Sequence, residues 1–213
     1  MRADNHPWEE IFKKNGRVFP EPFPRFNEVV DLFIGRGCSQ ILDLGCGSGR
    51  HTVHLAKENF KTFGLDISFT GLGLTREWLR TQGLESRIVQ SDFRHPLPFR
   101  EGSFSGVFST QVIHHARMAA VRLAIQEIWR VLSSGGVAFI SVAAKKDDEE
   151  FVEIEPGTIV PLTGSEAGLP HHIFSEEELR VEFREFQVDD VSLRAGGKVL
   201  AIAACKPGPG HTS

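Results

Sequence analysis

The chain has no tyrosine, only three cysteines, and no apolar run long enough to cross a membrane. The absence of tyrosine removes the phenol as a candidate acid or base. Cys38, Cys46 and Cys205 stand at no metal-ligand spacing, so we expect reduced thiols and no disulfide framework. The polar N-terminus MRADNHPWEE has no apolar signal core. These absences favour a cytoplasmic protein with no membrane partner.

The sequence also lacks a block of positive charge, and its formal net charge is -4 over 213 residues. Binding to the phosphates of a nucleic acid needs clustered lysines and arginines. The composition therefore argues against nucleic acid as the main partner. Nothing in the sequence sets the oligomeric state.

Short apolar runs of strand type alternate with segments of helical period along most of the chain. Strands are expected over residues 41–44, 62–65, 87–90, 104–110 and 137–143, and helices over residues 25–34, 50–59, 70–81 and 119–132. The sequence SSGG at 133–136 is expected to end the last of these helices. A regular alternation of strand and helix predicts a parallel sheet with helices on both faces.

The end of the chain breaks this alternation, because residues 186–193 and 198–204 are strand-like and are joined across Gly196-Gly197. A turn that short connects antiparallel neighbours. We therefore predict an α/β, Rossmann-like sheet of seven strands, mostly parallel, with one antiparallel terminal strand. The expected organisation is a cover segment and first helix over 1–35, a main domain over 36–206 with an insertion at 145–174, and a disordered tail over 207–213.

The segment ILDLGCGSGRHTVHLA, residues 41–56, places a glycine-rich turn between a strand and a helix. Such a turn lets a ligand approach the backbone closely, and the helix N-terminus adds N–H groups and the positive end of the helix dipole. Asp66 follows at the end of the next strand, where a carboxylate can accept hydrogen bonds from both hydroxyls of a ribose. The combination predicts a nucleoside site.

The spacing of the glycines discriminates between nucleotides. A dinucleotide turn has glycines at relative positions 1, 3 and 6, whereas Gly45, Gly47 and Gly49 fall at positions 1, 3 and 5. Asp43 would repel a pyrophosphate but would attract an ammonium group. S-adenosylmethionine (SAM) carries an ammonium group and a sulfonium and has no phosphate, so it fits this turn better than NAD does.

With these features the sequence resembles the class I SAM-dependent methyltransferases, in particular a methyltransferase type 11/12-like domain. The resemblance covers roughly residues 36–206, and its motifs are LDLGCGSGR, GLDIS, SDF, LPFREGSFSGVFS, VIHH and EIWRVLSSGG. The closing hairpin is also similar to the last strands of that family's sheet. The resemblance implies transfer of a methyl group from SAM, with S-adenosyl-L-homocysteine as the product.

The resemblance also implies a role for each matching residue. The three glycines would line the methionine part of SAM, with Asp43 near its ammonium group. Asp66 would hold the ribose. The remaining cofactor contacts would come from Asp92 and Phe93 at the adenine and from Cys46, Arg50, Ile67 and Gln111. Simpler roles stay open, namely a tight turn for the glycines, a helix N-cap for Asp66 and a turn opener for Asp92.

The N-terminal stretch PWEEIFKKNGRVFPEPFPRF is a second candidate for covering the cofactor. Trp8 could lie against the sulfonium, because an aromatic face attracts a cation. Arg17 could pair with the methionine carboxylate. In the alternative interpretation, the aromatic residues only pack this segment onto the domain.

Four of the nine histidines stand in two pairs, His114-His115 and His171-His172. Neighbours on a strand point to opposite faces and neighbours on a helix diverge, so neither pair is expected to share one ion, and we predict no metal site. One histidine from each pair could still meet another, because both pairs are expected at the carboxyl edge of the sheet. We expect His114 or His115 to contact the methyl acceptor or to act as a base, with His171 and His172 at the pocket rim. A hydrogen bond to loop backbone is the competing role.

The chain adds little to a catalytic core, which favours a small-molecule acceptor. VIHHA and PHHIFSEEEL, with the closing hairpin, also resemble the methyltransferases that esterify a carboxymethyl group on the wobble uridine of tRNA, so a tRNA acceptor stays open. Two alternatives from other classes are an NAD-dependent oxidoreductase and a non-catalytic SAM-binding module. The glycine spacing argues against the first of them, and no sequence feature separates the second from an enzyme.

Overall fold

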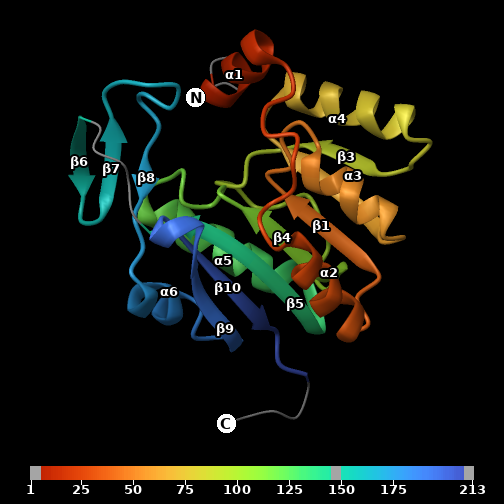
Figure 1. The fold of residues 1–213 in the computed structure, drawn as a ribbon. Helices are drawn as coiled ribbons and strands as arrows, with labels where there is room; N and C mark the ends of the chain where they lie inside the picture. The colour runs from red at the N-terminus through yellow and green to blue at the C-terminus, as the bar shows by residue number, and fades with distance from the viewer. Residues whose placement is uncertain (1–5, 145–149, 209–213) are drawn as a thin grey trace.

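The computed structural model describes residues 6–144 and 150–208, and its main sheet has seven strands in the order β3-β2-β1-β4-β5-β10-β9 (Figure 1). All neighbours in this sheet pair in parallel except β10, which is antiparallel to both β5 and β9. The fold predicted from the sequence is confirmed, and the antiparallel strand lies one place in from the edge. The strands are β1 Gln40–Leu44, β2 Lys61–Asp66, β3 Arg87–Gln90, β4 Phe104–Thr110, β5 Leu132–Ala143, β9 Gln187–Arg194 and β10 Val199–Cys205.

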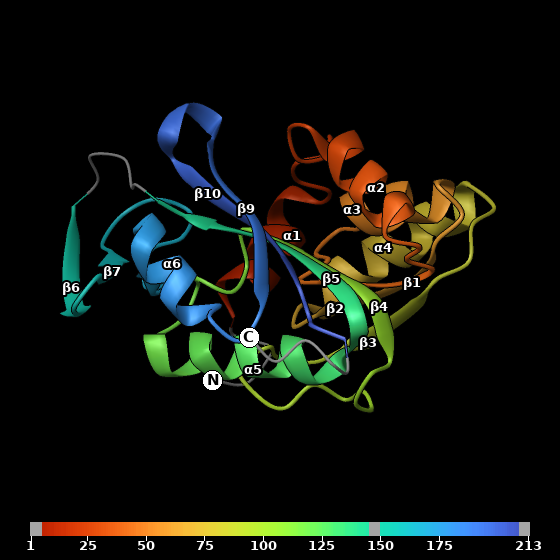
Figure 2. The same ribbon diagram turned by 90° about the horizontal axis from the view of Figure 1, so that it is seen from below.

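Helices cover both faces of the sheet, as Figure 2 shows for α5 and α6 on one face and α2, α3 and α4 on the other. In β1, Leu42 packs in the cluster that contains α5, whereas Ile41 packs in the cluster that contains α2. Successive side chains of a strand point to opposite faces, so a strand buried on both faces is apolar at successive positions. The helices are α1 Pro7–Asn15, α2 Phe26–Gly35, α3 Arg50–Lys57, α4 Phe69–Thr81, α5 Met118–Val131 and α6 Glu176–Glu182.

The sequence SSGG at 133–136 was expected to end α5, but it does not form a separate turn after the helix. The helix ends at Val131, and Leu132 is already extended, with φ -72° and ψ 135°. Strand pairing then jumps from Phe104–Leu132 to Gly106–Val137. The four residues are therefore an irregularity inside β5, and Gly135 adopts φ 76°, a conformation that favours glycine.

The insertion contains a second sheet that the sequence pattern did not predict. It has three antiparallel strands, β6 Phe151–Glu155, β7 Thr158–Pro161 and β8 His171–His172, in the order β6-β7-β8. Residues 145–149 of the expected insertion and 209–213 of the expected tail lie outside the described residues. This small sheet stands beside the carboxyl end of β5 (Figure 1).

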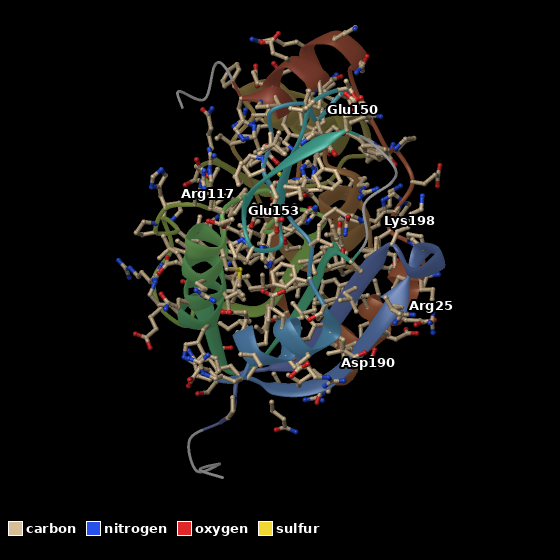
Figure 3. The ribbon with its side chains drawn as sticks, turned by 90° about the vertical axis from the view of Figure 1, so that its left-hand side faces the viewer. Arg25, Arg117, Glu150, Glu153, Asp190 and Lys198 are labelled. Carbon is tan, nitrogen blue, oxygen red and sulfur yellow. The ribbon has the colours of Figure 1, made fainter. Side chains whose placement is uncertain are left out.

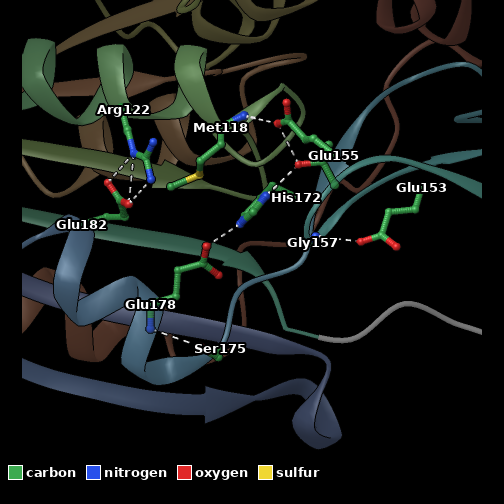
Figure 4. A network of polar contacts seen from close by, with 10 residues as sticks. Met118, Arg122, Glu153, Glu155, Gly157, His172, Ser175, Glu178 and Glu182 are labelled. Atoms are coloured by element: carbon green, nitrogen blue, oxygen red, sulfur yellow. Dashed lines mark hydrogen bonds and ion pairs between the residues drawn. The ribbon is translucent and has the colours of Figure 1, made fainter.

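A chain of buried polar contacts fixes the small sheet to α5 and α6 (Figure 4). Glu155 accepts hydrogen bonds from the backbone N of Met118 at 2.6 Å and from Thr158 Oγ1 at 3.0 Å. Thr158 Oγ1 lies 2.7 Å from His172 Nδ1, and His172 Nε2 lies 3.0 Å from Glu178 Oε1 on α6. His172 is buried within this network, so it positions β8 between the two helices.

Helix α1 is docked by one buried carboxylate. Glu9 is 4% exposed and accepts hydrogen bonds from Ser68 Oγ at 2.6 Å, Thr70 Oγ1 at 2.6 Å and Thr70 N at 3.1 Å. Burial by itself raises the pKa of Glu9, but the hydrogen bonds from Ser68 and Thr70 outweigh burial and hold the pKa below its usual value. The contact lies at the N-terminus of α4, where the helix dipole favours a negative charge.

Within the described residues, no helix is long and apolar enough to span a membrane.

Replacing Glu9 by alanine tests this docking. Glu9→Ala leaves Ser68 and Thr70 without their acceptor and is expected to lower the free energy of unfolding by about 2–4 kcal/mol. Limited proteolysis is expected to cut residues 16–25 faster, because α1 no longer holds them. Glu10→Ala is the matched control, since the Glu10 side chain is exposed and pairs with the exposed Lys13. Equal cleavage rates in the two variants would show that Glu9 does not hold α1.

Candidate functional site

A pocket of about 550 Å³ opens at the carboxyl ends of the parallel strands. The strand order reverses between β1 and β4, and in open α/β sheets ligands bind at such a switch point. The volume lies in the range of small-molecule sites. The predicted site residues that line this pocket are Trp8, Gly45, Cys46, Gly47, Arg50, Asp66, Ile67, Asp92, Phe93, Gln111, His114, His115 and His171. Four predicted site residues are not part of the lining: Arg17, Asp43, Gly49 and His172.

The glycine turn after β1 has no room for side chains. A Cβ atom at Gly45 would lie 2.2 Å from Val112 Cγ2, and the φ angle of Gly45 is +78°. Gly47 and Gly49 also have positive φ angles, of +53° and +92°. Glycine is therefore required at position 45 both by its backbone conformation and by the close approach of the loop after β4.

Asp66 links the turns that follow β1 and β2. Its Oδ2 accepts a hydrogen bond from Gly47 N at 2.8 Å, and its Oδ1 accepts one from Ser68 N at 2.8 Å. Burial raises the pKa of Asp66 to about 6, although these backbone hydrogen bonds oppose the shift. These two hydrogen bonds hold the carboxylate in place on the pocket wall.

Asp43 lies beneath the glycine turn, away from the pocket wall. It is 1% exposed and accepts a hydrogen bond from Thr52 Oγ1 at 2.6 Å. Burial raises the pKa of Asp43 to about 7, against the effects of Thr52 and Arg50. Its observed contact is with the first turn of α3, so it supports the glycine turn from behind.

Asp92 has the turn-opening role that the sequence left open, and it also lines the pocket. Its Oδ1 accepts a hydrogen bond from Arg94 N at 2.9 Å, and Arg94 Nη2 lies 2.7 Å from Oδ2. Burial by itself raises the pKa of Asp92, but the contacts with Arg94 outweigh burial and lower the pKa. Asp92 is thus oriented by the chain that follows it.

The N-terminal segment covers one side of the pocket. The Trp8 ring lies 5.8 Å from the ring of His115, and Phe23 N donates to Nε2 of the buried His51 at 3.0 Å. Burial, with a contribution from Arg50, lowers the pKa of His51 well below its usual value. Arg17 stacks 4.1 Å above the Trp78 ring, which accounts for its absence from the pocket lining.

Three histidines converge at the pocket wall next to Trp8. His114 and His115 lie in the loop after β4, and His171 lies on β8. One ring nitrogen from each of the three lies within 4.8 Å of the other two. The expectation that adjacent histidines must diverge is wrong here, because residues 111–117 form neither strand nor helix. Gln111 begins this irregular loop with a φ angle of +58°.

Sequence reasoning missed two charged residues of the pocket, Glu166 and Lys198. Glu166 lies in the insertion, with Oε2 at 3.0 Å from His171 Nε2 and Oε1 at 3.7 Å from His115 Nε2. Lys198 lies next to the short 3₁₀ helix η2 (Ala195–Gly197) at the tip of the hairpin between β9 and β10 (Figure 3). Glu166 lies in the insertion, which has no clear periodicity, and Lys198 begins the strand-like segment 198–204 without a motif around it, so no sequence pattern pointed to them as pocket residues. The helix that carries Glu9 did have a signal, since proline follows His6 and two acids fill the first turn.

Comparison with known proteins places this pocket in context. A family model described as a methyltransferase domain matches residues 42–140. An uncharacterized methyltransferase of Synechocystis sp. is 33% identical over 115 residues, which are 53% of this chain and 51% of that protein. The human protein named Probable tRNA methyltransferase 9B is 33% identical over 139 residues, which are 65% of this chain and 28% of that protein. The chain spans about half or less of the length of these curated relatives.

Among solved structures, a similar fold is found in the 1,6-didemethyltoxoflavin-N1-methyltransferase of Burkholderia thailandensis, which was determined with 1,6-didemethyltoxoflavin and S-adenosylhomocysteine bound. The TM-score is 0.72 at 20% sequence identity, and the match covers 93% of this chain and 84% of that one. At this identity the likeness concerns the fold.

The buried Asp43 gives a prediction for stability against pH. Its pKa is about 7 in the folded chain against 3.8 as the ordinary value, so the folded chain holds the proton more tightly. Stability is therefore expected to fall as the pH rises from about 4 to about 7. Asp43→Asn is expected to reduce this slope and to raise the free energy of unfolding above pH 7 by roughly 2–4 kcal/mol.

Urea denaturation of the ligand-free protein between pH 4 and 8 measures this effect, with the exposed Asp31→Asn as control. An Asp43→Asn profile parallel to that of the wild type would contradict it.

Proposed function

Since the chain belongs to the class I SAM-dependent methyltransferase family, we propose that it transfers the methyl group of SAM to a small-molecule acceptor bound beside the histidines of the pocket. One observation carries the proposal: the glycine turn and Asp66 line the same cavity of about 550 Å³ as His114, His115 and His171. A methyl donor at the turn and an acceptor at the histidines would therefore meet inside one cavity.

The cofactor half of the pocket follows from the chemistry of its wall. The backbone of Gly45 and Gly47 would lie against the methionine part of SAM, and Asp66 would accept hydrogen bonds from the ribose hydroxyls. Asp92 and Phe93 would contact the adenine, and Trp8 would present an aromatic face to the sulfonium. Further contacts would come from Cys46, Arg50, Ile67 and Gln111, which also line the pocket. Asp43 would act from behind the turn, where the charged form of its carboxyl group would favour the ammonium group.

The acceptor half supplies the transfer chemistry. The nucleophile of the acceptor attacks the methyl carbon, the carbon–sulfur bond breaks, and sulfur keeps the electron pair as the neutral thioether of S-adenosyl-L-homocysteine. The chain must align these atoms and keep water out, which the cover formed by α1 would do. If the nucleophile carries a proton, His114 or His115 would be the base that removes it.

A tRNA acceptor is the second candidate function, and the similarity to the human protein named Probable tRNA methyltransferase 9B favours it. Binding of a tRNA would require arginines directed at phosphates. Arg117 pairs with Glu155 of the small sheet, and Arg122 of α5 pairs with Glu182 of α6. These internal pairs make the surface less suited to phosphates, so we favour the small acceptor.

Removing the charge of Asp66 tests the cofactor half. Asp66→Asn is expected to weaken the binding of SAM and of S-adenosylhomocysteine by about 10- to 100-fold, since hydrogen bonds to a charged group contribute about 1.5–3 kcal/mol. Isothermal titration calorimetry measures the affinities, with the exposed Asp190→Asn as control. Thermal unfolding of the same samples separates loss of binding from loss of structure. Unchanged affinity in a folded Asp66→Asn protein would remove Asp66 from the site.

Transfer of a labelled methyl group identifies the acceptor class. The protein is incubated with cell extract and SAM labelled in its methyl group, and the product is separated by size and by sensitivity to ribonuclease. Label in small molecules is the expected result. Label only in RNA would favour the tRNA alternative. Binding of SAM without transfer to any fraction would favour a non-catalytic binding module, and binding of NAD tighter than SAM would favour an oxidoreductase.

A further inference from the structure

The histidine cluster has the composition and arrangement of a metal site. His114, His115 and His171 each bring one ring nitrogen within 4.8 Å of the others, and all three rings are buried at the pocket wall. Imidazole nitrogens are ligands for zinc and for other divalent transition metals, whereas magnesium and calcium prefer oxygen ligands. Around a tetrahedral zinc ion the nitrogens lie about 3.4 Å apart, so the three rings would close slightly on the ion.

The hydrogen bonds of His171 fix which nitrogen is available. Its Nδ1 lies 2.8 Å from the carbonyl oxygen of Leu169, and a carbonyl only accepts, so Nδ1 carries the proton. This leaves Nε2 as the nitrogen that faces the cluster. A ring N–H donated to a backbone carbonyl is the support that metal-binding histidines commonly have.

Glu166 places a negative charge beside the ring nitrogens of the cluster. Its two carboxylate oxygens face two different histidines, with Oε2 at 3.0 Å from His171 Nε2 and Oε1 at 3.7 Å from His115 Nε2. The lone pair of a neutral Nε2 and a carboxylate oxygen repel each other unless a cation lies between them. That cation is a proton or a metal ion. A divalent ion at this position would attract the carboxylate and accept the lone pairs of several imidazoles at once, which matches the approach of three ring nitrogens to one another.

We propose that His114, His115 and His171, supported by Glu166, bind a divalent transition-metal ion of the zinc class on the acceptor side of the pocket. Resting on the proposed methyl transfer, the ion would take an oxygen of the acceptor as its exchangeable ligand. With the ion bound, the lone pairs of His114, His115 and His171 are taken up by the metal, so none of these histidines acts as the base, and an acceptor hydroxyl would lose its proton to solvent on binding the ion. Its oxygen would then form the bond to the methyl carbon as the carbon–sulfur bond breaks, which makes hydroxyl or carboxylate compounds the expected acceptors.

Metal binding is tested directly on the purified chain after removal of metals with a chelator. Co²⁺ is titrated while its visible absorption is recorded, and Zn²⁺ is titrated by calorimetry. The expected result is saturable binding of a single ion per chain, which Mg²⁺ does not displace. His171→Gln and His115→Gln are each expected to weaken binding more than tenfold. His95→Gln, which replaces an exposed histidine outside the cluster, is expected to bind as the wild type does.

Glu166→Gln keeps the test decisive if a buried histidine variant fails to fold, because Glu166 is half-exposed and its replacement is expected to weaken binding about tenfold or more. Absence of saturable Co²⁺ and Zn²⁺ binding in the wild type would overturn the metal site, as would wild-type affinity in folded His171→Gln and Glu166→Gln proteins. Titration of SAM into the same samples separates the two proposals. SAM binding without metal binding refutes only the ion, and metal binding without SAM binding refutes only the proposed function.

Discussion

The pocket depends on two buried carboxylates joined through one serine. Asp66 holds Gly47 N and Ser68 N, so it fixes the turns after β1 and β2 to each other. The side chain of Ser68 then donates to Glu9, which docks α1 over the pocket. The negative charge of Glu9 in turn contributes to the raised pKa of Asp66. The pocket wall at Asp66 and the helix α1 that Glu9 docks are thus parts of one hydrogen-bond network, so a change at either carboxylate affects the other.

The histidine cluster joins three segments that are distant in the sequence. The loop after β4 brings His114 and His115, β8 brings His171, and Glu166 precedes β8. The backbone N of His172 donates to the carbonyl of His114 at 2.8 Å, which ties β8 to that loop. The side chain of His172 contacts Thr158 and Glu178 instead of joining the cluster. The small sheet therefore contributes His171 to the wall of the pocket, on the part where we propose that the acceptor binds.

The sequence was sufficient for the main sheet, and most of the residues that it singled out line the pocket. Buried strands such as β1 are apolar at successive positions, and the glycines of the turn and Asp66 follow strand ends in a local pattern. The sequence was insufficient for the parts of the pocket that are formed by contacts between distant segments. Asp43 has the sequence position of a ligand-binding residue but is directed at Thr52. His114 and His115 are adjacent, yet their irregular backbone lets both rings face the same point, which rules for strands and helices did not anticipate.

A crystal structure with S-adenosyl-L-homocysteine bound is the most direct test of the central claim, which is that the cofactor turn and the histidine cluster form one reaction chamber. We expect both ribose hydroxyls to lie within hydrogen-bond distance of the Asp66 carboxylate. We also expect the sulfur atom to face the part of the pocket lined by His114, His115 and His171. A ligand bound at any other position, or one whose sulfur points away from the histidines, would contradict it.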